Sequence, residues 1–447
     1  MPSGKTKPKL IKRKYKRKTV FKSTVGGLLV GLVSGGVAIV YRLVSSEFQK
    51  VHHFIIGYAT NVWMVMLYFL VFVFMALAVR KIITWEPFVA GSGISEVRGE
   101  VQGYFKMNWL KVLIAKFVGC LLAMAGGLSL GREGPSVQMG AMAGKGLAKL
   151  SHRGEKAERY LITCGASAGL SAAFNCPLTG VMFALETFNT AYSVNLLFTA
   201  MVASVTADFV SKVCFGMSPV FSVPLLKFLP LTSVGFVILL GVFCGITGKF
   251  FNWSMQKTRK FYQKLPLPEN MEPLIPFLAA GILGFVLPDV LGDGDIILTQ
   301  LVRGQFTLTM IALLLAVKFG FSMLCFTSKT PGGSLAPMMV LGAFVGGLYG
   351  HLAVSALGLQ TTYLNNFIIL AMAGYFAAIV RTPLTAVALA CELTGSFSHL
   401  IYFGIVVTVA ELVSTLMKTE PMYESGLNQL IQTRHITTQS EMTLKEA

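Results

Sequence analysis

The stretch Gly131–Gly144, with the sequence GREGPSVQMGAMAG, decides the fold, because it recurs later in the chain. The copy is Gly333–Gly346, with the sequence GSLAPMMVLGAFVG. Both follow the pattern G-x-x-x-P-x-x-x-x-G-A-x-x-G without a gap, and their prolines stand 202 positions apart. A single match of this kind could arise by chance. A second match in the same order and at a similar offset would indicate an internal repeat.

A second match does follow, in the same order. Pro177 precedes Glu186 by nine residues, and Pro383 precedes Glu392 by nine residues, at an offset of 206. Each proline opens a short apolar piece, and proline suits the first turn of a helix. Repeated halves with glycine- or proline-interrupted helices at corresponding positions indicate a transporter whose site lies at the membrane midplane.

The composition agrees with a membrane protein. The chain has 447 residues, of which 54% are hydrophobic and 13% charged, whereas soluble domains carry roughly 25% charged residues. A membrane-crossing helix needs about 20 mainly apolar residues. Such stretches lie near 25–44, 61–79, 109–126, 194–214, 231–251, 272–291, 307–326, 336–357, 363–380 and 398–417. Shorter apolar pieces lie near 135–150, 159–173, 177–188 and 383–393. We expect an all-α polytopic membrane protein with broken helices.

We expect one membrane domain, residues 25–433, made of a first repeat at about 25–215 and a second at about 230–433. Residues 1–24 form a basic tail and residues 434–447 a short C-terminal tail. The first 22 residues hold ten Lys or Arg and no acid. A basic block next to an apolar run favours a cytoplasmic N-terminus near anionic lipid over a nucleic-acid arm. We expect no nucleic-acid partner.

Three glycine-led segments are candidates for an anion pathway: Gly91–Ile94, Gly131–Pro135 and Gly332–Pro337. A helix that begins inside the bilayer exposes unpaired N–H groups and the positive end of its dipole, which together bind anions. The Ser92 hydroxyl adds a donor, and Gly134 allows close approach of the backbone. For any one segment alone, glycine-mediated helix packing is the favoured interpretation. Three such segments in one chain, two of them related by the repeat, favour an anion pathway.

Glu133 is the candidate for proton coupling. A carboxylate within the membrane is costly and by default functional. At the head of a broken helix its charge would occupy the place of an anion, and protonation would free that place. The alternative is a structural ion pair with the adjacent Arg132.

Four motifs resemble the CLC family of chloride channels and proton/chloride exchangers. They stand in the family's order: Gly91–Ile94, Gly131–Pro135, Gly333–Pro337 and Glu420–Tyr423. The similarity covers about residues 25–433. The resemblance implies two inverted repeats of tilted and broken helices, and a homodimer with a separate pore in each subunit.

The resemblance also implies roles for particular residues. Ser92 and Tyr423 would supply hydroxyls to a central chloride, with the N–H groups of Ser334 and Leu335 beside them. Glu133 matches the family's gating glutamate. Serine rather than proline at position 92 favours chloride over nitrate. The function expected is proton-coupled chloride exchange.

The chain also departs from the family. Ser95 stands where a proline is usual, and Ser334-Leu335 replace the usual Ile-Phe. Thr187 stands where many exchangers carry a second glutamate as an internal proton relay, and Glu186 points some 100° away around the helix. Thr187 therefore favours an alternative function, a passive voltage- or pH-gated chloride channel.

An intramembrane serine hydrolase is the remote alternative. Ser129 and Ser167 each lie in a G-x-S-x-G pattern, but that nucleophile elbow needs a strand before it and a helix after it. The seven cysteines are scattered and form no C-x-x-C, so we expect no disulfide frame, metal or other cofactor. The first apolar run, 25–44, lacks a signal-peptide cleavage site and is interpreted as a membrane anchor. The regulatory domains of many eukaryotic members are not expected here, which favours a prokaryotic inner membrane.

Overall fold

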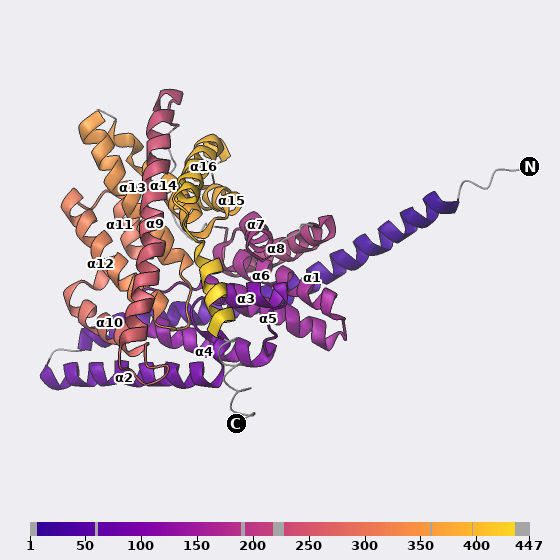
Figure 1. Ribbon diagram of the computed structural model, residues 1–447, viewed down its shortest axis with the longest axis horizontal. Helices are drawn as coiled ribbons and strands as arrows, with labels where there is room; N and C mark the ends of the chain where they lie inside the picture. Colours follow the sequence, from indigo (N-terminus) through magenta and orange to yellow (C-terminus); the bar gives the residue numbers. More distant parts are fainter. Residues whose placement is uncertain are drawn as a thin grey trace, which may run out of the picture.

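The computed structural model describes residues 7–58, 61–188, 193–217, 228–357, 360–395 and 397–433. These residues are mostly helical, and an isolated antiparallel bridge joins Gly131 and Gly333. The α-helices shown in Figure 1 are α1 Lys7–Tyr58, α2 Val62–Trp85, α3 Ile94–Gln102, α4 Trp109–Ala125, α5 Glu133–Leu150, α6 Glu155–Phe174, α7 Pro177–Phe188, α8 Val194–Phe215, α9 Val234–Lys264, α10 Leu274–Val286, α11 Asp295–Val302, α12 Leu308–Thr327, α13 Leu335–Leu357, α14 Leu364–Val380, α15 Pro383–Thr394 and α16 Leu400–Leu416.

Two sets of eight helices follow one another along the described chain, α1–α8 and α9–α16. The glycine-led helices α5 and α13 correspond, and the helices that open on proline, α7 and α15, correspond as well. The expected all-α architecture of two inverted repeats of broken helices is confirmed. Residues 422–433 add a further helix after the second set.

Eight helical segments within the described residues are long and apolar enough to cross a membrane. The expected crossings near 109–126 and 272–291 are shorter: α4 has 17 residues and α10 has 13. The helix α10 ends at Val286, because the next residue, Leu287, precedes Pro288 and a residue before proline is disfavoured in helical conformation. The short helix α11 comes next, and the apolar pattern did not predict it.

The first helix is longer than expected. The apolar run 25–44 lies inside α1, which begins at Lys7 and continues to Tyr58 over 52 residues. Residues 1–6 of the expected basic tail, and the whole expected tail 434–447, lie outside the described residues.

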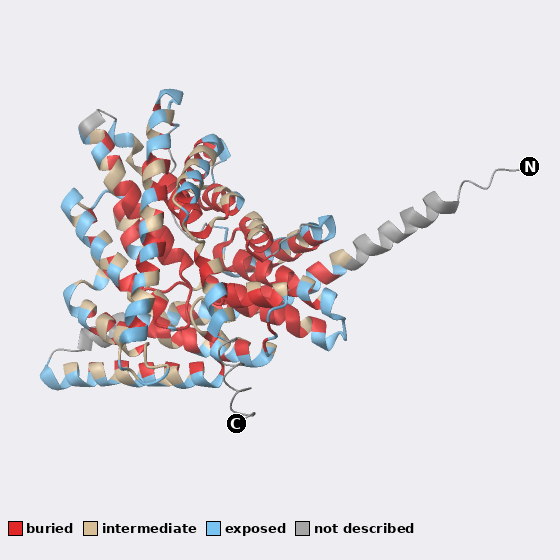
Figure 2. Cartoon of the chain, in the orientation of Figure 1, coloured by how far each residue is buried: buried red, intermediate tan, exposed pale blue. Residues whose placement is uncertain are grey.

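Small residues allow the central helices to approach closely. A Cβ at Gly140 in α5 would lie 2.4 Å from the Gly165 carbonyl oxygen in α6, and a Cβ at Gly165 would lie 2.2 Å from the Gly140 carbonyl oxygen. Figure 2 shows that α5 and α6 form part of the buried centre. Close backbone contact between small residues is a common way for helices to associate in lipid.

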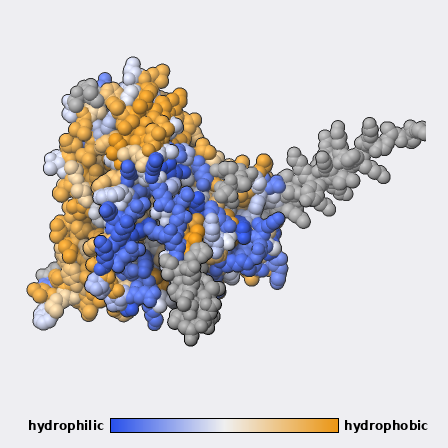
Figure 3. All heavy atoms as spheres, in the orientation of Figure 1, coloured by the Kyte–Doolittle hydropathy of each residue, from blue (hydrophilic) through white to orange (hydrophobic). Residues whose placement is uncertain are grey.

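The outer helices present apolar side chains to their surroundings. Trp63 and Phe74 on α2 are 78% and 71% exposed, and Val194 at the start of α8 is 82% exposed. Figure 3 shows hydrophobic residues over much of the left edge and top of the molecule, and hydrophilic residues gathered on the lower centre of this face. Apolar exposure on this scale fits contact with lipid.

Candidate functional site

Two of the three glycine-led segments meet through backbone hydrogen bonds. The Gly131 N–H donates to the Gly333 carbonyl at 2.7 Å, and the Gly333 N–H donates back to the Gly131 carbonyl at 2.7 Å. The third segment joins them, because the Gly332 N–H donates to the Gly91 carbonyl at 3.0 Å. A Cβ at Gly134 would lie 3.0 Å from the Gly333 Cα. Loops from both repeats therefore converge at one junction.

Ser92 belongs to the same junction. Its carbonyl oxygen lies 3.1 Å from the position that a Cβ on Gly134 would take. Its hydroxyl oxygen accepts a hydrogen bond of 3.3 Å from the Ile94 N–H, at the start of α3. Gly93, the residue before the helix, has φ +86°, a left-handed conformation that glycine adopts without strain.

Three helices begin at this junction, as the glycine patterns predicted: α3 at Ile94, α5 at Glu133 and α13 at Leu335. The residues before α3 and α5, Gly93 and Arg132, make no side-chain cap, and in the first turn of α3 the Ile94 N–H donates to the Ser92 hydroxyl oxygen. The first N–H groups of a helix lack partners within the helix, and the dipole places partial positive charge there. The junction is therefore suited to an anion.

The Glu133 carboxylate lies between the starts of α5 and α13. It is 1% exposed, and its Oε2 has no hydrogen-bond partner. A Cβ at Gly131 would lie 2.2 Å from Oε2 and 3.2 Å from the Ala336 Cβ, so the carboxylate folds back over Gly131. Among the described ion pairs, none joins Glu133 to Arg132. The structural ion pair considered from sequence is not formed.

Tyr423 brings an unsatisfied hydroxyl to the same region. Its side chain is 2% exposed, and its Oη has no hydrogen bond of normal geometry. It lies beside Ser334 and within electrostatic reach of Glu133. The Tyr423 ring packs edge-on against Phe183 at 6.2 Å. Leu335 is 1% exposed at the start of α13.

Ser95 explains one departure from the family's pattern. Its hydroxyl donates a hydrogen bond of 2.9 Å to the Tyr423 carbonyl. Proline at position 95 could not make this bond. The hydroxyl ties α3 to the segment that carries Tyr423.

Thr187 and its neighbour Glu186 have different surroundings. The Thr187 side chain is 5% exposed, and its Oγ1 has no hydrogen-bond partner. The Glu186 carboxylate instead accepts hydrogen bonds from the N–H groups of Leu384 at 3.0 Å and Thr385 at 2.8 Å. Glu186 thus caps the start of α15 in the other repeat.

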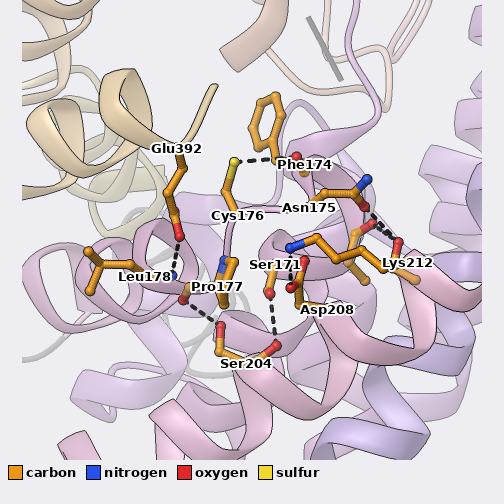
Figure 4. Close-up of polar contacts among 12 residues, drawn as sticks. Ser171, Phe174, Asn175, Cys176, Pro177, Leu178, Ser204, Asp208, Lys212 and Glu392 are labelled. Carbon is orange, nitrogen blue, oxygen red and sulfur yellow. Dashed lines mark hydrogen bonds and ion pairs between the residues drawn. The ribbon is translucent and has the colours of Figure 1, made fainter. Parts of the chain in front are cut away.

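Glu392 makes the reciprocal contact. Its carboxylate accepts from the N–H groups of Leu178 at 2.9 Å and Thr179 at 2.8 Å, at the start of α7. Figure 4 shows Glu392 reaching down to Leu178. Each repeat therefore caps a half-helix of the other, which accounts for the matching nine-residue spacing. This contact gives Glu392 a structural role.

Two buried lysines hold the loops that precede short helices. The Lys116 Nζ donates to the carbonyls of Val89 at 3.0 Å and Gly91 at 2.6 Å, just before α3. The Lys318 Nζ donates to the carbonyl of Gly292 at 2.6 Å, just before α11. No motif predicted a role for Lys116, although its position 202 residues before Lys318 matches the repeat offset.

The serines of the enzyme alternative are placed without catalytic partners. The Ser129 hydroxyl is hydrogen-bonded to the Ser322 hydroxyl at 2.8 Å. Ser167 lies inside α6 and its Oγ has no partner. No strand precedes either serine in the part of the chain that the structure describes. Within the same residues, no group of three or more His, Cys, Asp or Glu is arranged to hold a metal ion.

Comparisons with known proteins agree on one family. The sequence profile described as voltage gated chloride channel matches residues 71–415. The H(+)/Cl(-) exchange transporter ClcA of Citrobacter koseri is 30% identical over 440 residues, covering 94% of this chain and 91% of that protein. The protein of the same name from Vibrio cholerae is 29% identical over 444 residues, covering 95% and 93%.

Solved structures share the fold. A slow cyanobacterial Cl−/H+ antiporter superposes with a TM-score of 0.87 at 24% identity, covering 92% of this chain and 99% of that one. A CLC-type fluoride/proton antiporter superposes with a TM-score of 0.70 at 23% identity, covering 87% and 95%.

Proposed function

Because the chain belongs to the voltage-gated chloride channel (CLC) family, we propose that it carries chloride across a membrane in exchange for protons. The relatives named H(+)/Cl(-) exchange transporter support this function over most of the chain. The family is one of transporters and channels, which argues against an enzyme.

The observation that carries the proposal is the position of Glu133. Its carboxylate is buried, has an unpartnered oxygen, and lies between two helix starts whose N–H groups suit an anion. While charged, Glu133 takes the place of a chloride ion. When protonated, it loses its attraction to the helix starts and chloride takes its place. One side chain thereby links the movement of a proton to that of an anion.

The residues proposed to hold chloride surround this position. Ser92 and Tyr423 offer hydroxyls, and the N–H groups of Ser334 and Leu335 lie at the start of α13. Gly134 lets the backbones approach closely. Dipoles attract an anion without the strong binding of a desolvated lysine or arginine, so the ion is released again.

The test uses purified protein in liposomes with a chloride gradient and a pH electrode. Wild-type protein should drive proton uptake against the proton gradient, and Glu133→Gln should abolish proton movement while chloride still passes. Glu47→Gln is the control, since Glu47 pairs with Lys50 at an exposed position. Coupling that persists in Glu133→Gln would contradict the role of Glu133.

Thr187 supports the second candidate, a passive chloride channel. Threonine cannot bind and release a proton as a carboxylate does, and Glu186 is engaged in capping α15. In the liposome experiment a channel would give chloride flux without any proton movement in the wild-type protein.

Selectivity gives a further test at Ser92. Ser92→Pro removes the hydroxyl and should shift preference from chloride toward nitrate, as measured by competing fluxes in liposomes. Unchanged selectivity would mean that Ser92 does not touch the ion.

The assembly and the location are part of the proposal. We propose a homodimer in a bacterial inner membrane, with the basic N-terminal segment on the cytoplasmic side. The ten cations among the first 22 residues support this orientation. Cross-linking in membranes and accessibility of a cysteine introduced near the N-terminus would test the two statements.

A further inference from the structure

Gln138 of α5 packs against the loop Gly91–Gly93, which carries the Ser92 hydroxyl. Its side chain is 0% exposed. Its Nε2 donates a hydrogen bond of 2.8 Å to the carbonyl of Phe88, in the 3-10 turn just before the loop. The same Nε2 lies 4.0 Å from the Sδ of Met107, in the segment after α3. Gln138 therefore ties α5 to the segments on both sides of α3.

The amide oxygen of Gln138 faces Gly93. A Cβ at Gly93 would overlap this amide and would lie 2.8 Å from the Gln138 Cβ. The opposite orientation of the amide would place two oxygens 2.8 Å apart at Phe88, so the hydrogen bond fixes which atom faces the loop. The Oε1 has no hydrogen-bond partner. Because a buried acceptor without a partner destabilises a protein, packing alone does not account for a glutamine at this position.

The second repeat has the same arrangement with an apolar side chain. The loop Gly292–Gly294 precedes α11, and its flanking glycines have φ +66° and +97°, close to the +62° and +86° of the first loop. Val340 stands 202 positions after Gln138. It packs against the second loop, since a Cβ at Gly294 would lie 2.9 Å from the Val340 Cγ1.

The two loops differ in the chemistry that they carry. The first has the Ser92 hydroxyl, which is proposed to touch chloride, and the second has the carboxylate of Asp293, which repels anions. A valine is sufficient to support the second loop. Of the two loops, the one proposed to hold chloride is the one with a glutamine behind it, and the amide N–H makes a hydrogen bond that valine cannot make.

We propose that Gln138 is a positioning residue for the chloride site, because its N–H group holds the turn before the loop and so fixes where the Ser92 hydroxyl lies. The inference rests on the proposed transport of chloride and deepens it. Lys116 of α4 holds the carbonyls of Val89 and Gly91 in the same segment, so two helices hold it. Without the Gln138 bond the loop is held less firmly against α5, and the hydroxyl meets the ion less often in its binding geometry.

The test is Gln138→Val, which gives the first loop the support that the second loop has. Chloride affinity measured by calorimetry should fall about two- to tenfold, the effect of losing one hydrogen bond between neutral groups. In liposomes, the chloride concentration for half-maximal flux should rise by a similar factor. The number of protons moved per chloride should stay at the wild-type value, because Glu133 is unchanged. Gln138→Met keeps the unbranched chain without the amide and should behave in the same way, also where the valine variant does not fold.

Val340→Ala is the matched control, because it removes packing against Gly294 at the corresponding position. It should lower thermal stability in detergent and leave chloride affinity at the wild-type value, which separates a positioning role from a structural one. An equal loss of affinity in Val340→Ala would overturn the inference.

Wild-type affinity in both Gln138 variants would also overturn it. So would tighter binding, which would mean that the open Oε1 weakens chloride binding more than the N–H group supports it. The failure of the proposed function looks different, since the wild-type protein itself would then neither bind nor carry chloride, and the inference would fail with it.

Discussion

Replacing Glu186 by alanine removes the cap that α7 provides for α15 in the other repeat. The carboxylate accepts three hydrogen bonds: from the Leu384 N–H at 3.0 Å, the Thr385 N–H at 2.8 Å and the Thr385 hydroxyl at 2.5 Å. A hydrogen bond to a charged group contributes about 1.5–3 kcal/mol. The three share one carboxylate and are not additive, so we expect a loss of about 2–4 kcal/mol in the free energy of unfolding.

The assay is equilibrium unfolding in mixed micelles of a mild detergent and dodecyl sulfate. Glu392→Ala is the matched comparison, because Glu392 makes the same three contacts with Leu178 and Thr179, at 2.6–2.9 Å. Its loss should be similar. Because both carboxylates act on the same pair of helices, the double variant should lose less than the sum of the two losses.

The same residue also tests the assignment of function. If Glu186 is a structural cap, Glu186→Gln should keep proton coupling in liposomes while lowering stability. Two results would refute this reasoning. One is a change in unfolding free energy below about 0.5 kcal/mol, the range of ordinary surface substitutions. The other is a stable Glu186→Gln protein that has lost proton movement, which would make Glu186 the substitute for the relay missing at position 187.

Two further predictions concern the packing of the centre. Gly140→Ala should destabilise the protein by about 1–3 kcal/mol, because the new Cβ would lie 2.4 Å from the Gly165 carbonyl oxygen. Gly404→Ala is the control and should not destabilise the protein, because nothing lies within 4 Å of the new Cβ. Equal thermal stability of the two variants in detergent would contradict the close contact. Lys116→Met removes the hydrogen bond of 2.6 Å that the lysine donates to the Gly91 carbonyl. The free energy of unfolding should fall by about 1–3 kcal/mol, and chloride binding measured by calorimetry should weaken. Chloride binding of wild-type strength would show that the lysine does not hold the loop beside Ser92.

Much of the architecture could be predicted from local patterns. Apolar runs mark the long helices, and proline and glycine mark the starts of α5, α7, α13 and α15. The shared patterns around Pro135 and Pro337 revealed the repeat, since a duplicated half keeps the residues that its helix starts require. The short helix α11 escaped prediction, because eight residues beginning with an aspartate have no clear apolar period.

The sequence by itself determined that this chain is a duplicated helical membrane protein with several helix starts inside the lipid, because glycine, proline and apolar periodicity act over a few neighbouring residues. Only the tertiary structure decided which of those starts meet. It joined Gly131 to Gly333 and paired Glu186 with the start of α15. Such contacts join residues about 200 positions apart. They depend on how the two halves pack together, which no local pattern records.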